Sequence, residues 1–155
     1  MKKGVFAGSF DPFTNGHLEI IEKASALFDE LVVGILYNQD KKYTFNSELR
    51  IQAVTKACKH LKNVTVKSYD GMLVDFLKSE NTVYFVRGLR NEKDYKYEEK
   101  VRRINKNFYP QIEYVYLCPD KFTSVSSTLV KSKLSCGEDV SDLVPESVLE
   151  YLQKK

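Results

Sequence analysis

The sequence predicts an α/β fold, a Rossmann-like single domain with a parallel sheet of about five strands. Three observations support this. Short apolar runs of strand type alternate with segments whose apolar residues recur at helical spacing. The apolar runs are nearly continuous, which is typical of parallel strands buried on both faces. The chain has 155 residues, of which 43% are hydrophobic and 29% charged, as in a folded globular domain.

Strands and helices are expected to alternate along the chain. Apolar runs predict strands at 4–7, 31–37, 64–66, 83–86 and 112–117. Apolar spacing predicts helices within 20–28, 49–61, 72–77, 97–108 and 126–134, and a last helix that begins at Pro145. One buried parallel sheet is expected to contain Val5, Phe6, Val33, Ile35, Val83, Phe85 and Val115.

Four segments that carry small, hydroxyl or basic side chains follow predicted strands. They are 8–17, 38–42, 87–90 and 120–128, after the first, second, fourth and fifth strands. In open parallel sheets, ligands bind beyond the carboxyl ends of the strands, near the point where the strand order reverses. We therefore expect these four segments to converge on one site.

The first of these segments has the character of a phosphate-binding turn. After the apolar run come Gly8 and Ser9, and then Thr14-Asn15-Gly16-His17, which opens a helical pattern. The N-terminus of a helix presents unpaired N–H groups and a positive dipole, which suit a phosphate. A histidine in that first turn can hydrogen-bond to charge that develops during a reaction. His60 lies among lysines at the end of a predicted helix, and we assign it no catalytic role.

Charge and composition argue against several classes of function. A net charge of +3, from 24 basic and 21 acidic residues, does not indicate nucleic-acid binding, and the basic run 100–106 fits the polar face of a helix. No apolar run approaches the ~20 residues of a membrane helix. Three widely spaced cysteines and two histidines give neither a disulfide framework nor a metal site. We expect a cytoplasmic protein with no nucleic-acid or membrane partner.

Several motifs occur in a specific order. Gly8-Ser9-Phe10-Asp11-Pro12 precedes the T-x-G-H quartet 14–17, and Arg87-Gly88-Leu89-Arg90 and the S-S-T-x-x-K segment 126–131 follow. This arrangement resembles the phosphopantetheine adenylyltransferase family of the nucleotidyltransferase superfamily, over about residues 3–152. The resemblance implies one nucleotidyltransferase domain over 1–155 that transfers adenylyl from ATP to 4′-phosphopantetheine. It also implies Mg²⁺ carried mainly on the ATP phosphates, no protein metal site, and a homohexamer.

The resemblance also implies roles for individual residues. The catalytic set would be His17, as a transition-state stabiliser, with Lys41 and Arg90. The contacts to 4′-phosphopantetheine would be Ser9, Lys41, Leu73 and Arg87. The contacts to ATP would be Ser9, Phe10, His17, Gly88, Leu89, Arg90, Glu98, Phe122, Thr123, Ser124, Val125, Ser126, Ser127 and Thr128.

Some positions leave alternatives open. Lys42 can replace Lys41 by a slip of one residue, and Arg87 can instead form a structural salt bridge. Asp11 is expected to bond nearby N–H groups of its own turn. The segment 120–125 is one residue shorter than is usual in the family, so its contacts to adenine and triphosphate stay open. Alternative functions are a sister transferase with another acceptor, a nucleotide sensor, and a nucleic-acid-binding module.

Overall fold

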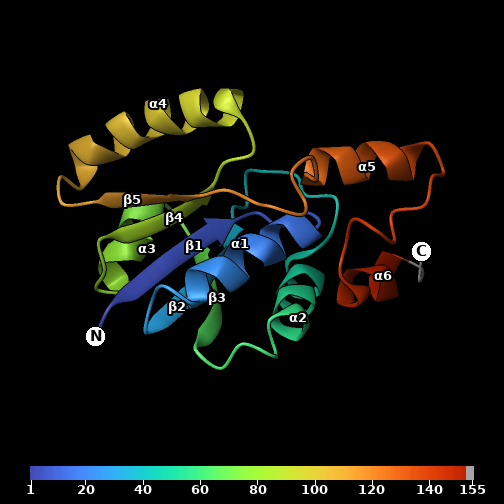
Figure 1. Cartoon of the computed structure of the whole chain (residues 1–155), viewed down its shortest axis with the longest axis horizontal. Coiled ribbons are helices and arrows are strands. Elements are labelled where there is room, and N and C mark those ends of the chain that lie inside the picture. The colour runs from blue at the N-terminus through green and yellow to red at the C-terminus, as the bar shows by residue number, and fades with distance from the viewer. Residues whose placement is uncertain (153–155) are drawn as a thin grey trace.

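The computed structural model describes residues 1–152, and its centre is a sheet in which every neighbouring pair of strands is parallel. The strands are β1 (Lys3–Gly8), β2 (Glu30–Tyr37), β3 (Val64–Asp70), β4 (Tyr84–Gly88) and β5 (Glu113–Leu117). Their order is β3-β2-β1-β4-β5, so the winding reverses between β1 and β4 (Figure 1). The predicted fold class is confirmed. Residues 153–155 of the expected domain lie outside the described residues.

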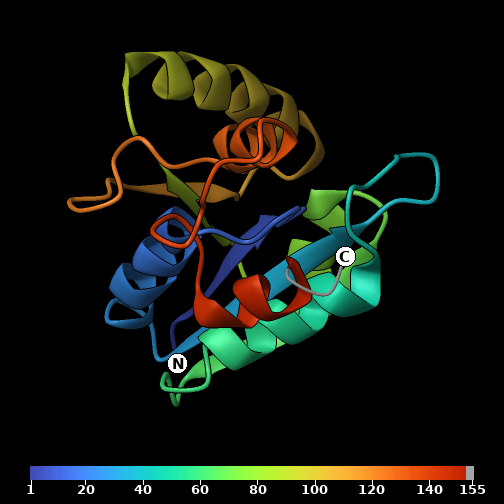
Figure 2. The ribbon, with the colours of Figure 1, turned by 90° about the vertical axis from the view of Figure 1, so that its right-hand side faces the viewer.

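The helices cover the sheet on both faces. They are α1 (Asn15–Ser25), α2 (Ser47–Ala57), α3 (Leu73–Ser79), α4 (Glu92–Phe108), α5 (Ser127–Ser135) and α6 (Glu146–Leu152). Helices α1, α2, α5 and α6 share one core cluster with alternate side chains of β1 and β2, whereas α3 packs in a second cluster on the other face. Helix α6 lies beside α2 (Figures 1 and 2), where the Ser147 hydroxyl donates to the carbonyl of Ala53 over 2.8 Å.

The central strand shows how one sequence builds both cores. Phe6 belongs to the cluster with α1 and α2, and its neighbours Val5 and Ala7 belong to the cluster with α3. Successive side chains of a strand point to opposite faces, so a continuous apolar run fills both. All three residues are buried.

The strand predictions fail in part, at the start of β4 and in the two edge strands. Val5, Phe6, Val33, Ile35 and Phe85 are buried in the sheet as expected. Val83 lies just before β4 and is half-buried, and Val115 lies in β5 but is also half-buried. Strand β3 continues to Asp70, well past the predicted 64–66, with alternating exposure. Both β3 and β5 are edge strands, which receive less cover than the centre.

Candidate active site

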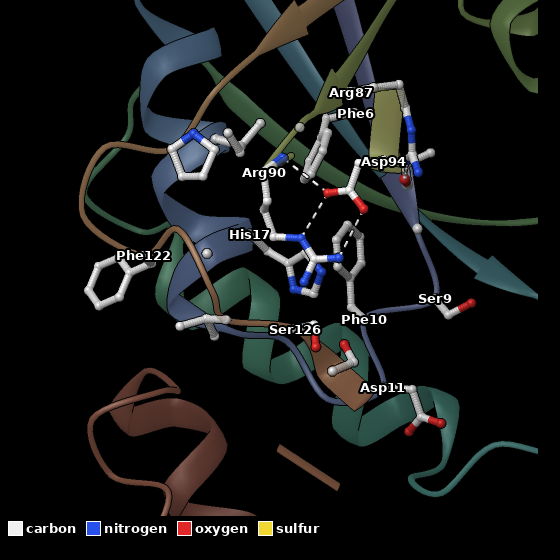
Figure 3. Close-up of a pocket in the computed structure, with 18 of the residues that line it drawn as sticks. Phe6, Ser9, Phe10, Asp11, His17, Arg87, Arg90, Asp94, Phe122 and Ser126 are labelled. Carbon is white, nitrogen blue, oxygen red and sulfur yellow. Dashed lines mark hydrogen bonds and ion pairs between the residues drawn. The ribbon is translucent and has the colours of Figure 1, made fainter. Parts of the chain in front are cut away.

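A cavity of about 480 Å³ opens at the carboxyl ends of the central strands (Figure 3). Its walls come from the β1–α1 segment, the first turns of α1, the loop after β2, the end of β4 with the start of α4, and the chain between β5 and α5. The four segments singled out in the sequence therefore converge on one cavity. It lies at the switch point between β1 and β4, as expected for this topology.

Most of the predicted site residues line this cavity. They are Ser9, Phe10, His17, Lys41, Arg87, Gly88, Arg90, Glu98, Phe122, Val125, Ser126 and Ser127. The predicted residues outside the lining are Leu73, Leu89, Thr123, Ser124 and Thr128. Leu73 is the first residue of α3 and packs, partly buried, against the second core cluster, and Thr123, Ser124 and Thr128 are exposed. Lys42, the alternative to Lys41, also lines the cavity, as do four residues to which the sequence assigned no role: Tyr43, Asp94, Tyr97 and Lys131.

His17 is oriented by the residue that caps its helix. The backbone N–H of Thr14 donates to Nδ1 of His17 over 3.0 Å, and the N–H of His17 donates back to Oγ1 of Thr14 over 3.2 Å. Because Nδ1 accepts a hydrogen bond, the proton of the neutral ring lies on Nε2. The ring also packs against Phe10 and Phe13, with centroids 5.0 and 5.6 Å away. Nε2–H is thus a fixed donor on a side chain that lines the cavity.

The surroundings of His17 keep its ring neutral. Desolvation of the ring is the main cause that lowers the pKa of His17, and the positive charges of Arg87 and Arg90 lower it further. Together they bring the pKa to about 3. At neutral pH the imidazole therefore donates a hydrogen bond without carrying a charge. It cannot act as a base either, since Nδ1 is engaged by Thr14 and Nε2 already holds the proton.

Two glycines allow close approach around the first turn of α1. A Cβ on Gly16 would lie 3.3 Å from the carbonyl oxygen of Val125, tighter than most real contacts. A Cβ on Gly88 would lie 2.9 Å from Cγ1 of Ile20. These glycines let the α5 segment and the end of β4 pack directly on α1, which brings the walls of the cavity together.

Arg87 takes part in a salt bridge and also lines the cavity. Its Nε and Nη2 donate to the carboxylate of Glu98 over 3.0 and 2.8 Å, and its Nη1 donates to the Ala7 carbonyl over 2.9 Å. The structural salt bridge weighed in the sequence is therefore present. A guanidinium has N–H groups to spare beyond these bonds, because Nη1 and Nη2 each carry a second one. Glu98, expected at ATP, is buried and engaged by Arg87.

Arg90 is held in a similar way by the first turn of α4. Its Nε and Nη2 donate to the carboxylate of Asp94 over 2.9 and 3.1 Å, and its backbone N–H donates to the same group (Figure 3). Burial raises the pKa of Asp94, but the hydrogen bonds and charge of Arg90 outweigh burial and lower it. The sequence signal for this pair was an acid at i+4 from the arginine.

The loop after β2 is attached to the first loop of the site. Lys41 Nζ lies 3.2 Å from Oγ of Ser9, a contact that favours Lys41 over Lys42 as the lysine nearest the turn after β1. The carboxylate of Asp11 accepts from the N–H groups of Thr44 and Phe45 over 2.8 and 2.9 Å. The expectation that Asp11 bonds its own turn is therefore wrong: it joins two loops.

Arg50 was missed in the sequence and supports the same region from beneath. It is 1% exposed, and its Nη1 donates to the carbonyls of Ser9 and Leu36 over 2.7 and 3.1 Å. Its Nε donates to the carbonyl of Phe45 over 3.1 Å, and the guanidinium stacks 3.9 Å from the ring of Tyr43. Its position on the apolar stripe of α2 was the available signal.

The three hydroxyls that open α5 have separate roles. Ser126 caps the helix by accepting from the N–H of Leu129, and Ser127 donates its hydroxyl to the carbonyl of Pro12 over 2.7 Å. Thr128 is exposed and lies outside the cavity lining. The ATP contacts expected at these three residues stay predictions. Lys131, one turn later in the same motif, lines the cavity.

The cavity is suited to anions, and its carboxylates are already engaged by other donors. Cationic side chains line it on several sides, from Lys41 and Lys42, Arg87 and Arg90, and Lys131. The three lining carboxylates, Asp11, Asp94 and Glu98, are each engaged by the donors described above. Among residues 1–152 there is no cluster of three His, Cys, Asp or Glu that could hold a metal ion. In the same part of the chain no helix is long and apolar enough to span a membrane.

Comparisons with known proteins identify the family of the chain. The family described as Cytidylyltransferase-like matches residues 5–133. A phosphopantetheine adenylyltransferase of Shouchella clausii is 41% identical over 155 residues, which is 99% of this chain and 98% of the relative. One of Clostridium botulinum is 43% identical, over 96% of this chain and 94% of the relative.

A solved structure agrees at the level of the fold. It is a Vibrio parahaemolyticus protein assigned as a nicotinate-nucleotide adenylyltransferase, with a TM-score of 0.71 and 22% identity. The match covers 99% of this chain and 93% of that one. From the sequence comparisons, the chain belongs to the Cytidylyltransferase-like family and, within it, to the phosphopantetheine adenylyltransferases.

Proposed function

We propose that this protein transfers the adenylyl group of ATP to 4′-phosphopantetheine, giving 3′-dephospho-coenzyme A and pyrophosphate in a reversible reaction. The observation that carries the proposal is the neutral, oriented Nε2–H of His17 in a cavity lined by cations. This is the arrangement needed to meet charge that develops on a phosphate between two bound anions.

The chemistry requires positioning more than proton transfer. An oxygen of the acceptor phosphate attacks the α-phosphorus of ATP, one P–O bond forms, and the bond to the pyrophosphate oxygen breaks. The acceptor phosphate is already ionised, so no general base is needed. This fits a histidine whose Nδ1 is occupied and whose pKa is lowered to about 3. In this scheme Nε2–H of His17 stabilises the negative charge on the α-phosphoryl group.

The cationic side chains divide between the two substrates. Lys41, beside Ser9, and Arg87 hold the acceptor phosphate against repulsion from ATP. Arg90 and Lys131, with the start of α5, hold the β- and γ-phosphates. Phe10, Gly88 and the segment around Phe122 surround the rest of the nucleotide. The remaining contacts expected from the family, at Leu73, Leu89, Thr123, Ser124 and Thr128, stay predictions, as does any direct ATP contact of Glu98.

Magnesium enters as part of the substrate, MgATP. The three carboxylates that line the cavity are engaged by Arg87, Arg90 and backbone N–H groups, so they do not form a set of protein ligands for the ion. The phosphates of ATP are then its main ligands.

A panel of acceptors tests the proposal. The full chain is incubated with ATP, Mg²⁺ and one acceptor at a time, and the release of pyrophosphate is measured. We expect rapid release with 4′-phosphopantetheine and little with nicotinate mononucleotide or a cytidylyltransferase acceptor with CTP. Activity only with another acceptor would assign a sister transferase, and no release with any acceptor would favour a nucleotide sensor.

We further propose that the protein assembles as a homohexamer in the cytoplasm. The exposed apolar side chains of α4 support assembly. Among the described residues of this helix only Glu98 is buried, whereas the apolar side chains of Tyr95, Ile104 and Phe108 are 45, 52 and 54% exposed. Helix α4 lies along one side of the molecule (Figure 2). The free thiols of Cys58, Cys118 and Cys136 fit a reducing compartment. Light scattering after size-exclusion chromatography would measure the assembly, and Ile104→Glu should reduce it.

A further inference from the structure

Glu19 binds a run of backbone N–H groups from a distant part of the chain. Its Oε2 accepts from the N–H groups of Asp120 and Lys121 over 2.7 and 3.1 Å, and its Oε1 accepts from that of Phe122 over 3.0 Å. Both carboxylate oxygens are therefore used, and three successive amides between β5 and α5 point at one side chain. Desolvation raises the pKa of Glu19, but these bonds together with Lys23 outweigh it and lower the pKa, so the group is ionised at neutral pH.

Lys23 holds the same segment from one turn further along α1. Its Nζ donates to the carbonyl of Cys118 over 2.7 Å and to the carboxylate of Asp120 over 2.5 Å. One face of α1 thus contacts the segment 118–122 at several points, through an acid and a base four residues apart. We call Glu19 and Lys23 the α1 clamp.

The clamped segment forms one wall of the cavity. Pro119 and Phe122 both line it, and in the view of Figure 3 Phe122 lies on the side of the site away from Ser9. Helix α1 also carries His17, only two residues before Glu19. The same rigid helix therefore fixes the donor of the reaction and the aromatic wall of the cavity.

We propose that Glu19 is a positioning residue for the nucleotide, which sets the base-binding wall at Phe122 at a fixed distance from Nε2 of His17. The inference rests on the proposed function. Because one ribose joins the base and the α-phosphorus of ATP, the distance between the wall at Phe122 and Nε2 of His17 must match the distance between these two parts of the nucleotide. A wall ordered before binding lowers the entropy cost of holding the nucleotide and places its α-phosphorus.

The substitution Glu19→Gln tests this role without changing the size of the side chain. The amide keeps the size of the side chain but has one oxygen, and its NH₂ group would face an N–H donor of the segment. Charge-assisted bonds to two carboxylate oxygens are replaced by one neutral acceptor. Glu22→Gln is the matched control, because Glu22 lies on the same helix outside the cavity and contacts His60 instead.

The experiment measures binding of ATP and of tripolyphosphate to the full chain by calorimetry, with no acceptor present. For Glu19→Gln we expect the Kd for ATP to rise about tenfold, the scale for lost hydrogen bonds to a charged group. The Kd for tripolyphosphate, which has no base, should change less than about twofold, as should both values in Glu22→Gln. KM for ATP should rise while KM for the acceptor stays constant.

An unchanged ATP affinity, or equal losses for ATP and tripolyphosphate, would overturn the inference. If Glu19→Gln does not fold, Lys23→Met, which loosens the other end of the clamp, is expected to give the same selective loss in weaker form, and the same two outcomes would overturn the inference there. A wild-type chain that binds ATP but forms no dephospho-coenzyme A would refute the proposed function alone, since the binding data require no turnover.

Discussion

The backbone N–H of Thr14 lies 3.0 Å from Nδ1 of His17, and the N–H of His17 lies 3.2 Å from the hydroxyl oxygen of Thr14. This reciprocal pair caps α1 and at the same time selects the tautomer of the histidine. The quartet T-x-G-H therefore has a physical explanation. Thr14 orients the ring, Gly16 lets Val125 approach, and His17 offers Nε2–H to the cavity.

Replacing His17 by alanine should slow the reaction more than it weakens binding. A donor that meets charge only as it develops contributes mainly to kcat. We expect kcat to fall by about 10²–10³, the usual result of removing one such donor, with a modest loss of ATP affinity. Steady-state kinetics and calorimetry measure the two quantities. His60→Ala, remote from the cavity, should change neither, and an intact kcat in His17→Ala would make His17 a ground-state ligand.

The ring of His17 should not titrate near neutral pH. With His60 replaced by Gln, one imidazole remains in the chain, since the sequence contains two histidines. Because burial and the two arginines lower the pKa of His17 to about 3, its NMR chemical shifts should stay constant between about pH 5 and 8. A titration centred near pH 6.5 would contradict the neutral-donor mechanism.

The same lowered pKa makes the stability depend on pH with a defined sign. In the unfolded chain an imidazole titrates near about 6.5, whereas in the folded protein His17 titrates at about 3. Between these values the unfolded state binds the extra proton, so the free energy of unfolding falls as the pH is lowered. Urea denaturation at several pH values should show a shallower decline in His17→Gln than in the wild type.

The fold and the location of the site could be read from the sequence because their signals are local. Each strand is an apolar run, each helix has its stripe, and the T-x-G-H, R-G-L-R and S-S-T motifs occur at or after the ends of three strands, β1, β4 and β5. The parallel topology then brings these segments to one edge of the sheet. Apart from Val83, the departures lie in the edge strands, because the cover of β3 and β5 depends on neighbours that the sequence does not reveal.

The supporting contacts could not be predicted, because they join residues far apart in sequence. Asp11 reaches Phe45, Arg50 reaches Ser9, and Glu19 reaches Asp120, with separations of 34, 41 and 101 residues. Nothing near these side chains in the sequence marks their partners, and an Asp after a turn or a Glu on a helix has many ordinary uses. These contacts become visible only when the loops are placed together.

Replacing Thr14 by alanine should have two separable effects. Loss of the N-cap hydroxyl should lower the free energy of unfolding by about 1 kcal/mol. The rate should fall less than in His17→Ala, because the backbone N–H of Thr14 still holds Nδ1. Thr14→Ser should restore both, since serine keeps the hydroxyl. Thermal denaturation and kcat measure the two effects, and a loss of rate as large as that of His17→Ala would show that the hydroxyl itself fixes the ring.

Replacing Arg87 by alanine should affect the acceptor and the stability together. We expect KM for 4′-phosphopantetheine to rise far more than KM for ATP. Stability should fall by about 3 kcal/mol, because Glu98 is left buried without its partner. The double variant Arg87→Met, Glu98→Leu should recover stability but not acceptor affinity. Equal increases in both KM values would refute the assignment of Arg87 to the acceptor side.

Among residues with no role in the proposed reaction, Arg50 is the one whose replacement should lower the free energy of unfolding most. It is 1% exposed and donates to carbonyls of three segments: the loop after β1, strand β2 and the loop before α2. Arg50→Ala removes these donors and opens a cavity beneath Ser9, so we expect the free energy of unfolding to fall by about 3–5 kcal/mol.

Two further substitutions provide comparisons for that loss of stability: lysine in place of Arg50, and alanine in place of an exposed basic residue. Arg50→Lys retains the charge but has no planar fork to reach several carbonyls, so it should recover only part of the stability. Lys59→Ala, at an exposed position just after α2, should change it by less than about 0.5 kcal/mol. Urea denaturation measures all three. Because Arg50 holds the loops of Ser9 and Tyr43, Arg50→Lys should also raise KM for the acceptor at a temperature where it remains folded. Full stability in Arg50→Ala would show that the three carbonyls are satisfied without the guanidinium.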